Sequence, residues 1–251
     1  MGASVMAQKH YAKAPIVEAA IDVRCVFGSE RTLEQLGPIQ GLLAADYPSS
    51  REDQVQFKAQ ITPAAGFTEE HKVTGFRVLT ADRSKIVGVS IDGFTFSWLA
   101  PYDRWESLRD EARRTWELYR SITSPISVSR VGVRFINRFD FPKLNEAGID
   151  LDQYFRTAPR IASELPQGLE SFFLRFQLGI DGSPRTTLTI TETGVAPASP
   201  DVVSVMLDID VFAQGLDVTV EEAWKIIERF RDQKNHAFES CITDEARKLI
   251  L

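Results

Sequence analysis

The sequence predicts an α+β protein built from two successive β-α-β(3–4)-α units, with an antiparallel sheet and long helices packed on one of its faces. Most apolar segments alternate with polar residues at a period of two, which is typical of half-buried strands. Two long segments instead carry apolar residues at helical spacing, and each follows a run of strands. The same order of elements occurs twice along the chain. We therefore expect a pseudo-duplicated protein in one compact body, divided as follows: an N-terminal arm over 1–14, a first repeat over 15–125 and a second over 126–251.

Composition excludes several classes of protein. The chain has 251 residues, of which 43% are hydrophobic and 25% charged, and its formal net charge is −6. These values are typical of a soluble globular protein, and no apolar run approaches the ~20 residues of a membrane span. Two cysteines, Cys25 and Cys241, form no disulfide framework, so we expect a cytoplasmic protein. The acidic balance argues against nucleic acid as a partner.

The first half is predicted to contain five strands and two helices. In order, these are a strand over 15–27, a helix over 31–47, four strands within 53–99 and a helix over 102–122. Gly37-Pro38 is expected to kink or interrupt the first helix, because proline lacks the N–H that the helix needs. Asp92-Gly93 separates two alternating segments, which is a strong signal for a hairpin turn.

The second half repeats this order. In order, it contains a strand over 129–141, a helical turn over 150–156, strands over 171–179, 185–193 and 202–212, a long helix after Thr219 and a short helix after Thr243. Thr219 and Glu222 have the spacing of a capping box, in which each side chain bonds the backbone N–H of the other residue.

One strand carries an unusual row of arginines. Opposite the apolar residues of 129–141 lie Arg130, Arg134 and Arg138, which we call the arginine face. Such a row is unfavourable unless anions lie beside it. The first strand offers Glu18 and Asp22, which are expected to pair with Arg134 and Arg130 if the strands that open the two repeats are neighbours. Asp208 and Asp210 of the strand over 202–212 offer further carboxylates.

The arginine face has a structural and a functional interpretation. In the first, it is a ladder of salt bridges on the outer face of the sheet. In the second, Arg134, Asn137, Arg138 and Arg175 receive a phosphate, a carboxylate or an acidic peptide. Catalysis is the weaker hypothesis, because arginine is no base near neutral pH and lowers the pKa of the carboxylates beside it.

Other chemistries find less support. Three histidines lack metal-ligand spacing, and neither common nucleotide cradle is present, so we expect no metal or cofactor. A second hypothesis is a pocket between helix and sheet for a small molecule, in a binding or hydrolytic protein of the helix-grip type. Its lining would be aromatic: Phe96, Trp98, Trp105 and Trp116. The same residues also suit a packed core.

Three segments together resemble a patchily distributed bacterial family of uncharacterised proteins. They are Pro15 to Ala19, the strand containing Gly132, Arg134, Phe135, Asn137 and Arg138, and the C-terminal stretch over 235–250. The resemblance covers nearly the whole chain, and Phe135 stands where the family is expected to carry a tyrosine. It implies no particular activity, cofactor or catalytic residue. The sporadic distribution of the family suggests an accessory gene of a mobile element or defence operon.

The sequence thus favours a non-enzymatic interaction protein. Its expected partner is another protein or a second copy of the chain, with a small anionic ligand as the alternative. The candidate binding residues are Glu18, Asp22, Arg130, Arg134, Asn137, Arg138 and Arg175.

Overall fold

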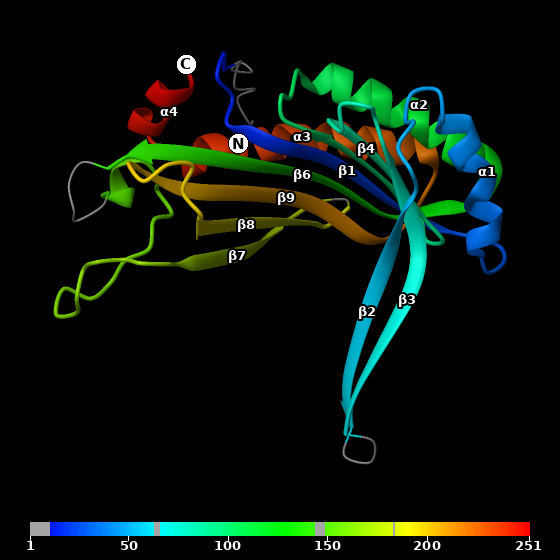
Figure 1. Ribbon diagram of the computed structural model, residues 1–251, viewed down its shortest axis with the longest axis horizontal. Helices are drawn as coiled ribbons and strands as arrows, with labels where there is room; N and C mark the ends of the chain where they lie inside the picture. Colours follow the sequence, from blue (N-terminus) through cyan, green and yellow to red (C-terminus); the bar gives the residue numbers. More distant parts are fainter. Residues whose placement is uncertain (1–10, 63–65, 144–148, 183) are drawn as a thin grey trace. The chain divides into compact units, whose positions relative to one another are not determined.

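A computed structural model describes residues 11–62, 66–143, 149–182 and 184–251 (Figure 1). The described residues form an α+β fold with nine antiparallel strands and four α-helices, as the sequence predicts. The strands are β1 Ile16–Val26, β2 Glu52–Thr62, β3 Gly66–Leu79, β4 Lys85–Ser90, β5 Gly93–Leu99, β6 Ser127–Pro142, β7 Phe173–Ile180, β8 Thr186–Val195 and β9 Val202–Val218. The helices are α1 Leu33–Leu43, α2 Trp105–Thr123, α3 Val220–Cys241 and α4 Asp244–Ile250, and a 3₁₀ turn spans Leu151–Gln153. The strand order is β2-β3-β4-β5-β1-β6-β9-β8-β7.

Contacts group the chain into two compact units. One unit comprises 18–133 and 213–227, and we call it unit A. The other comprises 1–17, 134–212 and 228–251, and we call it unit B. The elements β1, β6, β9 and α3 each contribute residues to both units.

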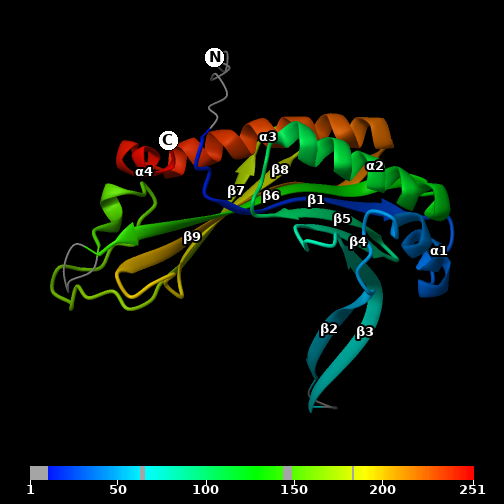
Figure 2. The same cartoon turned by 45° about the horizontal axis from the view of Figure 1, so that its top comes forward.

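Unit A contains the predicted four-stranded meander. Strands β2 to β5 pair antiparallel in chain order, and β5 also pairs with β1. The β2–β3 hairpin extends away from α1 and α2 (Figure 2). Helix α2 packs on β5 through an aromatic cluster in which Phe94 and Trp116 meet edge to face at 5.8 Å. All five apolar residues of the predicted stripe are buried in α2: Trp105, Leu108, Ala112, Trp116 and Tyr119.

Helix α1 differs from its prediction. The helix continues through Pro38 without a break. Leu36, Ile39 and Leu43 are buried on its inner face, and this burial offsets the backbone bond that proline cannot make. The leucine spacing of this segment also predicts Leu42 on the inner face, but the structure leaves it 49% exposed.

Unit B contains the outer strands of the second half. Strand β8 pairs antiparallel with β7 and with β9, without a register shift. One face of β9 is fully buried, with Val205, Leu207 and Ile209 at 0% exposure. Strand β9 continues to Val218, beyond its predicted end at 212, and ends just before the capping box of α3. Helix α3 then begins at the predicted capping box, in which Thr219 N donates to Glu222 Oε2 at 2.9 Å.

The first described residues, from Tyr11 to Lys13, contact the C-terminal helices in unit B. Residues 1–10 of the expected N-terminal arm lie outside the described residues. The rest of that segment is held in place, because Lys13 N donates to Ile250 O at 3.1 Å. Tyr11 also contacts α3 and α4, where Glu239 and Arg247 pair at 2.9 Å.

Candidate functional site

The arginine face of β6 forms as the alternation predicts. Val131, Val133 and Phe135 are buried at 0–1% exposure, whereas Arg134 on the opposite face has a side chain that is 51% exposed. The side chains of Arg130 and Arg138 are 26% and 29% exposed. Strand pleating therefore separates an apolar face from a partly exposed cationic face.

In unit A, Arg130 pairs with Asp22, as predicted. Asp22 belongs to β1, the neighbour of β6 in the sheet. The same carboxylate also pairs with Arg24 at 3.1 Å and accepts a hydrogen bond from Thr95 at 3.2 Å. Asp22 is therefore committed to three partners within the sheet, which favours a structural role.

In unit B, Arg134 pairs with Asp208, one of the further carboxylates that the sequence offers. Arg134 Nε and Nη2 donate to the two carboxylate oxygens of Asp208 at 2.9 and 2.6 Å. The predicted pairing of Arg134 with Glu18 of β1 stays a prediction. The fork of a guanidinium matches both oxygens of a carboxylate, so this pair fixes the orientation of Arg134.

Arg138, at one end of the arginine face, makes several polar contacts. It pairs with Asp140 at 3.1 Å and donates to Ser204 Oγ at 3.0 Å and to Ala196 O at 3.1 Å. Ser204 in turn donates to Asp140. These bonds occupy Arg138 and tie β6 to the start of β9.

Asn137 does not lie with the arginines. Its position places it on the apolar face of β6, where it is 2% exposed. Its amide donates to Leu207 O at 3.0 Å, so it contacts β9 from inside the protein. A buried polar side chain needs such a partner, and this explains an asparagine among aromatic residues.

Arg175 joins the site through the strand register. Arg175 of β7 lies directly opposite Thr191 of β8, and Thr191 lies opposite Asp208 of β9. Directly opposed residues share a face, so Arg134, Asp208, Thr191 and Arg175 form a line across unit B that we call the cross-strand row. In the described part of the chain, no ion pair or hydrogen bond is made by the exposed side chain of Arg175.

The cross-strand row is suited to binding an anion that reaches across strands. Arg175 offers free donors, Thr191 a hydroxyl, and Arg134 a half-exposed guanidinium already held by Asp208. The side chain of Arg134 is 51% exposed, so an incoming carboxylate or phosphate can approach its guanidinium from the solvent while Asp208 holds it in place.

Two ionisable side chains of unit B are buried on the inner side. Glu192 of β8 is 0% exposed, and burial raises its pKa, which a hydrogen bond from Thr157 only partly opposes. Lys234 of α3 is 8% exposed and lies over the ring of Phe135 at 3.6 Å. Burial lowers the pKa of Lys234 to about 7, and the positive charge of Arg231 adds to this. Neither Glu192 nor Lys234 lines the pocket of about 340 Å³ or the pocket of about 130 Å³.

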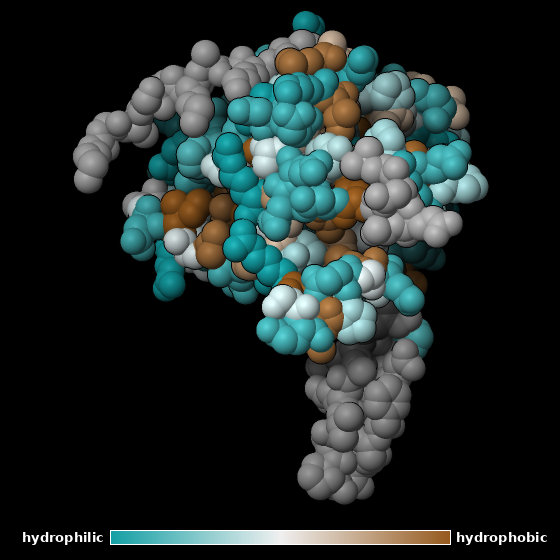
Figure 3. All heavy atoms as spheres, turned by 90° about the vertical axis from the view of Figure 1, so that its left-hand side faces the viewer, coloured by the Kyte–Doolittle hydropathy of each residue, from teal (hydrophilic) through white to brown (hydrophobic). Residues whose placement is uncertain are grey.

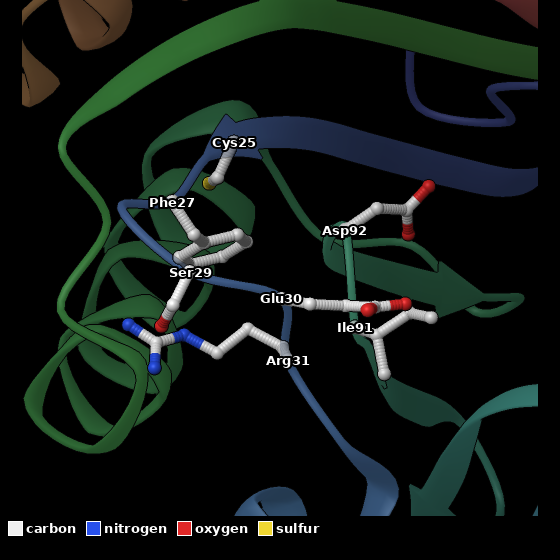
Figure 4. A pocket seen from close by; sticks show the side chains of 7 residues that line it. All are labelled: Cys25, Phe27, Ser29, Glu30, Arg31, Ile91 and Asp92. Atoms are coloured by element: carbon white, nitrogen blue, oxygen red, sulfur yellow. The ribbon is translucent and has the colours of Figure 1, made fainter.

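A pocket of about 340 Å³ in unit A is a weaker candidate. Figure 4 shows the ring of Phe27 between Cys25 and the Arg31 side chain, with Glu30 pointing away from Arg31 toward Ile91. The charged groups therefore diverge instead of meeting on one ligand. Burial raises the pKa of the Cys25 thiol to about 12, so it stays protonated and unreactive near neutral pH.

The aromatic residues of the alternative pocket are part of the core. Phe96, Trp105 and Trp116 are 0%, 4% and 1% exposed. Trp98 lies at the end of β5 beneath Lys85, whose ammonium is 4.1 Å from the centre of the indole ring. The 340 Å³ pocket and a smaller one of about 130 Å³ beside the β7–β8 turn have other linings.

The sequence reasoning missed several polar groups that had visible signals. Threonines occupy alternate positions 187, 189, 191 and 193 of β8, which predicts a hydroxyl-lined face. Glu192 falls in register with Leu188 and Ile190, and Lys234 falls within the apolar stripe of α3. A charged residue at an apolar position of a periodic pattern is the signal that marks both.

No protein-family model matches the chain, and no curated protein is similar to it. Among the residues that the structure describes, no group of three or more His, Cys, Asp or Glu side chains is arranged to hold a metal ion. No helix in these ranges combines the length and apolar character needed to cross a membrane.

Proposed function

We propose that the protein is a non-enzymatic interaction protein that binds an acidic or phosphate-bearing partner through the cross-strand row of unit B. The observation that carries this proposal is that two exposed arginines share one face of the sheet: Arg134, and Arg175, which has no ion pair or hydrogen bond to the described residues. Charge-assisted hydrogen bonds to such groups are about twice as strong as neutral ones.

Position and rigidity support a binding role. The row is built on four strands, whose register fixes the backbone position of each member, and the bidentate pair with Asp208 orients the side chain of Arg134. A site whose donors are already ordered loses less conformational entropy on binding than one on a loop. The alternation of positive and negative groups favours a partner whose acidic groups are spaced to match.

We also propose that the fold arose as a duplication. Outward from β1, the sheet continues through β5, β4 and β3, and outward from β6 it continues through β9, β8 and β7. In each series the first strand is the one that opens its half of the chain. The strands beside it then follow in the reverse of their order along the chain. The repeats would then be 15–125 and 126–251, each closed by a long helix, α2 or α3, on the same face of the sheet.

A role in the cytoplasm of a bacterium, encoded with a mobile element or a defence operon, belongs to the same proposal. It rests on the resemblance of Pro15 to Ala19 and of the β6 motif to a patchily distributed bacterial family. An accessory protein of this kind fits binding without catalysis.

The test is anisotropy of a labelled hexaglutamate peptide titrated with the protein. Arg175→Ala is expected to weaken binding about tenfold, the loss of roughly one charge-assisted hydrogen bond. Arg120→Ala is the control for the loss of one surface charge, because Arg120 is also an exposed arginine but lies on α2 of unit A, where it pairs with Glu117. Equal affinities for the wild type and both variants would contradict the proposal.

A charge exchange separates recognition from stability. The double variant Arg134→Asp with Asp208→Arg exchanges the two charged residues between β6 and β9. Because an ion pair can still form, the melting temperature should stay near that of the wild type. If the row recognises anions, the exchange moves the guanidinium to β9 and affinity for the peptide falls. A variant that folds and binds normally would show that the row is only a salt-bridge ladder.

A further inference from the structure

Strand β7 of unit B is an open sheet edge. It stands last in the strand order, with β8 as its neighbour. Six of its eight residues are exposed and none is buried. Phe173, Phe176 and Leu178 are 66%, 39% and 48% exposed. On the face of the protein that Figure 3 shows, hydrophobic residues lie among hydrophilic ones in several places.

The backbone of β7 presents unused hydrogen-bonding groups at regular intervals. Gly194 N donates to Phe172 O at 3.3 Å, which makes 172 and 194 a hydrogen-bonded pair in the β7–β8 register. In an antiparallel ladder such pairs alternate, so the even-numbered residues of β7 bond to β8. The N–H and C=O groups that point away from β8 therefore belong to Phe173, Arg175, Gln177 and Gly179.

This edge has few of the features that keep sheet edges of different molecules apart. Strand β7, FLRFQLGI, contains no lysine and no proline, its pairing with β8 has no bulge, and Arg175 is its one charged residue. Monomeric proteins normally block an edge of this kind with charge, proline or irregularity.

We infer that β7 pairs antiparallel with β7 of a second copy of this chain, so that the two sheets join into one across a twofold axis. The inference goes beyond the proposed function, since it concerns backbone pairing at the edge of β7, although Arg175 belongs both to this edge and to the cross-strand row. A strand paired with its own copy makes the same contacts from both sides, which is the isologous interface that twofold symmetry requires.

Charge and side-chain size select one register. With Phe176 opposite Phe176 of the copy, each Arg175 lies opposite a Gln177, whose amide oxygen can accept from the guanidinium. A register centred on Arg175 would place the two arginines opposite each other, which is unfavourable. In the favoured register all four outward-facing residues meet outward-facing residues of the copy.

The same register groups the apolar side chains. Leu174, Phe176 and Leu178 share the face of β7 that lies opposite the buried residues Leu188 and Ile190 of β8. Leu174 of one copy would lie opposite Leu178 of the other, with the two phenylalanines between them. Pairing therefore removes from water the side chains that the single chain leaves exposed.

Disulfide trapping tests both the contact and the register. At a non-hydrogen-bonded pair the Cα atoms are ~4.5 Å apart, within the range of a disulfide, so Phe176→Cys should give a covalent dimer under mild oxidation. Leu174→Cys is the matched control, because its copy would lie four residues away, roughly 13 Å. Both variants keep Cys25 and Cys241, so the native thiols contribute equally. Absence of the Phe176→Cys dimer, or equal cross-linking of the two variants, would overturn the inference.

Sedimentation velocity supplies the second readout. The wild type should move as a dimer of the 28.2 kDa chain at micromolar concentration. Gln177→Pro removes an outward-facing N–H that no intrachain partner needs, so the variant should fold and sediment as a monomer. Phe176→Lys should give the same result by placing two like charges in contact. A wild type that stays monomeric at about 100 μM, or folded variants that remain dimeric, would contradict the pairing.

Discussion

The arginines of β6 show how far a single side chain can be understood from its position in the sequence. Alternation alone places Arg130, Arg134 and Arg138 on one face, and the structure agrees. The sequence offered Asp208 as a carboxylate for these arginines but could not assign it to Arg134, because that contact depends on which strand lies beside β6. Asn137 was misplaced for a different reason. A polar residue was grouped by its chemistry with the arginines, although its odd number puts it on the apolar face.

Lys234 leads to a prediction about stability and pH. Burial lowers its pKa to about 7 in the folded protein, although the face of the Phe135 ring partly compensates the ammonium. Between pH 7 and the ordinary pKa near 10.4, the unfolded chain holds a proton that the folded chain has released. Stability must therefore rise with pH across this interval, by on the order of 1 kcal/mol per pH unit.

The variant Lys234→Met removes this dependence while it keeps the length of the side chain. Urea unfolding at pH 7, 8, 9 and 10 measures the effect. We expect Lys234→Met to be more stable than the wild type at pH 7 and the difference to shrink as the pH rises. Parallel stability curves for the two proteins would show that the lysine remains charged in the fold.

Among the helices, α3 depends on its first turn. Thr219 and Glu222 form the capping box, with Glu222 N donating to Thr219 Oγ1 at 3.3 Å. Thr219→Ala should lower the free energy of unfolding by about 1 kcal/mol, because it removes the acceptor for a free backbone N–H. Thr219→Ser keeps the hydroxyl and should lose much less. Denaturant titration at constant pH compares the two, and equal losses would rule out a capping effect.

Among the strands, β3 and β4 approach closely at a glycine. A Cβ on Gly75 would lie 2.1 Å from Val89 O, a backbone atom that cannot move aside. We expect Gly75→Ala to destabilise the protein by at least about 2 kcal/mol. Gly41→Ala on α1 is the control, because nothing lies within 4 Å of its added methyl group. Its helix should gain up to about 1 kcal/mol. Thermal denaturation distinguishes the two, and a Gly75→Ala variant as stable as the wild type would refute the close approach.

The secondary structure was largely predictable because periodicity records burial directly. The meander within 53–99, helix α2 and the capping box of α3 all follow from local patterns. Local rules failed at Pro38, where buried leucines on either side keep α1 continuous. They also failed at the end of β9, where the strand runs on to Val218. At Pro38 the error arises because burial of Leu36, Ile39 and Leu43 outweighs a local preference.

For the molecule as a whole, the strand order was the part that local patterns could not supply. The cross-strand row exists because β7, β8, β9 and β6 are consecutive in the sheet, although β6 is separated from β9 by about half of unit B's sequence. The net charge of −6 gives no hint of a cationic row, since the row is a local exception on an acidic protein. An anion-binding role therefore depends on short-range contacts and not on the long-range field.

The most direct measurement is to locate a bound anion by NMR of the arginine side chains. Nε–Hε signals are recorded while the protein is titrated with hexaglutamate peptide and, separately, with inorganic phosphate. We expect the signals of Arg175 and Arg134 to shift with a common, salt-sensitive dissociation constant, while those of Arg109 and Arg120 on α2 stay in place. Shifts spread evenly over the surface arginines, or none at Arg175 and Arg134, would contradict a binding role for the cross-strand row.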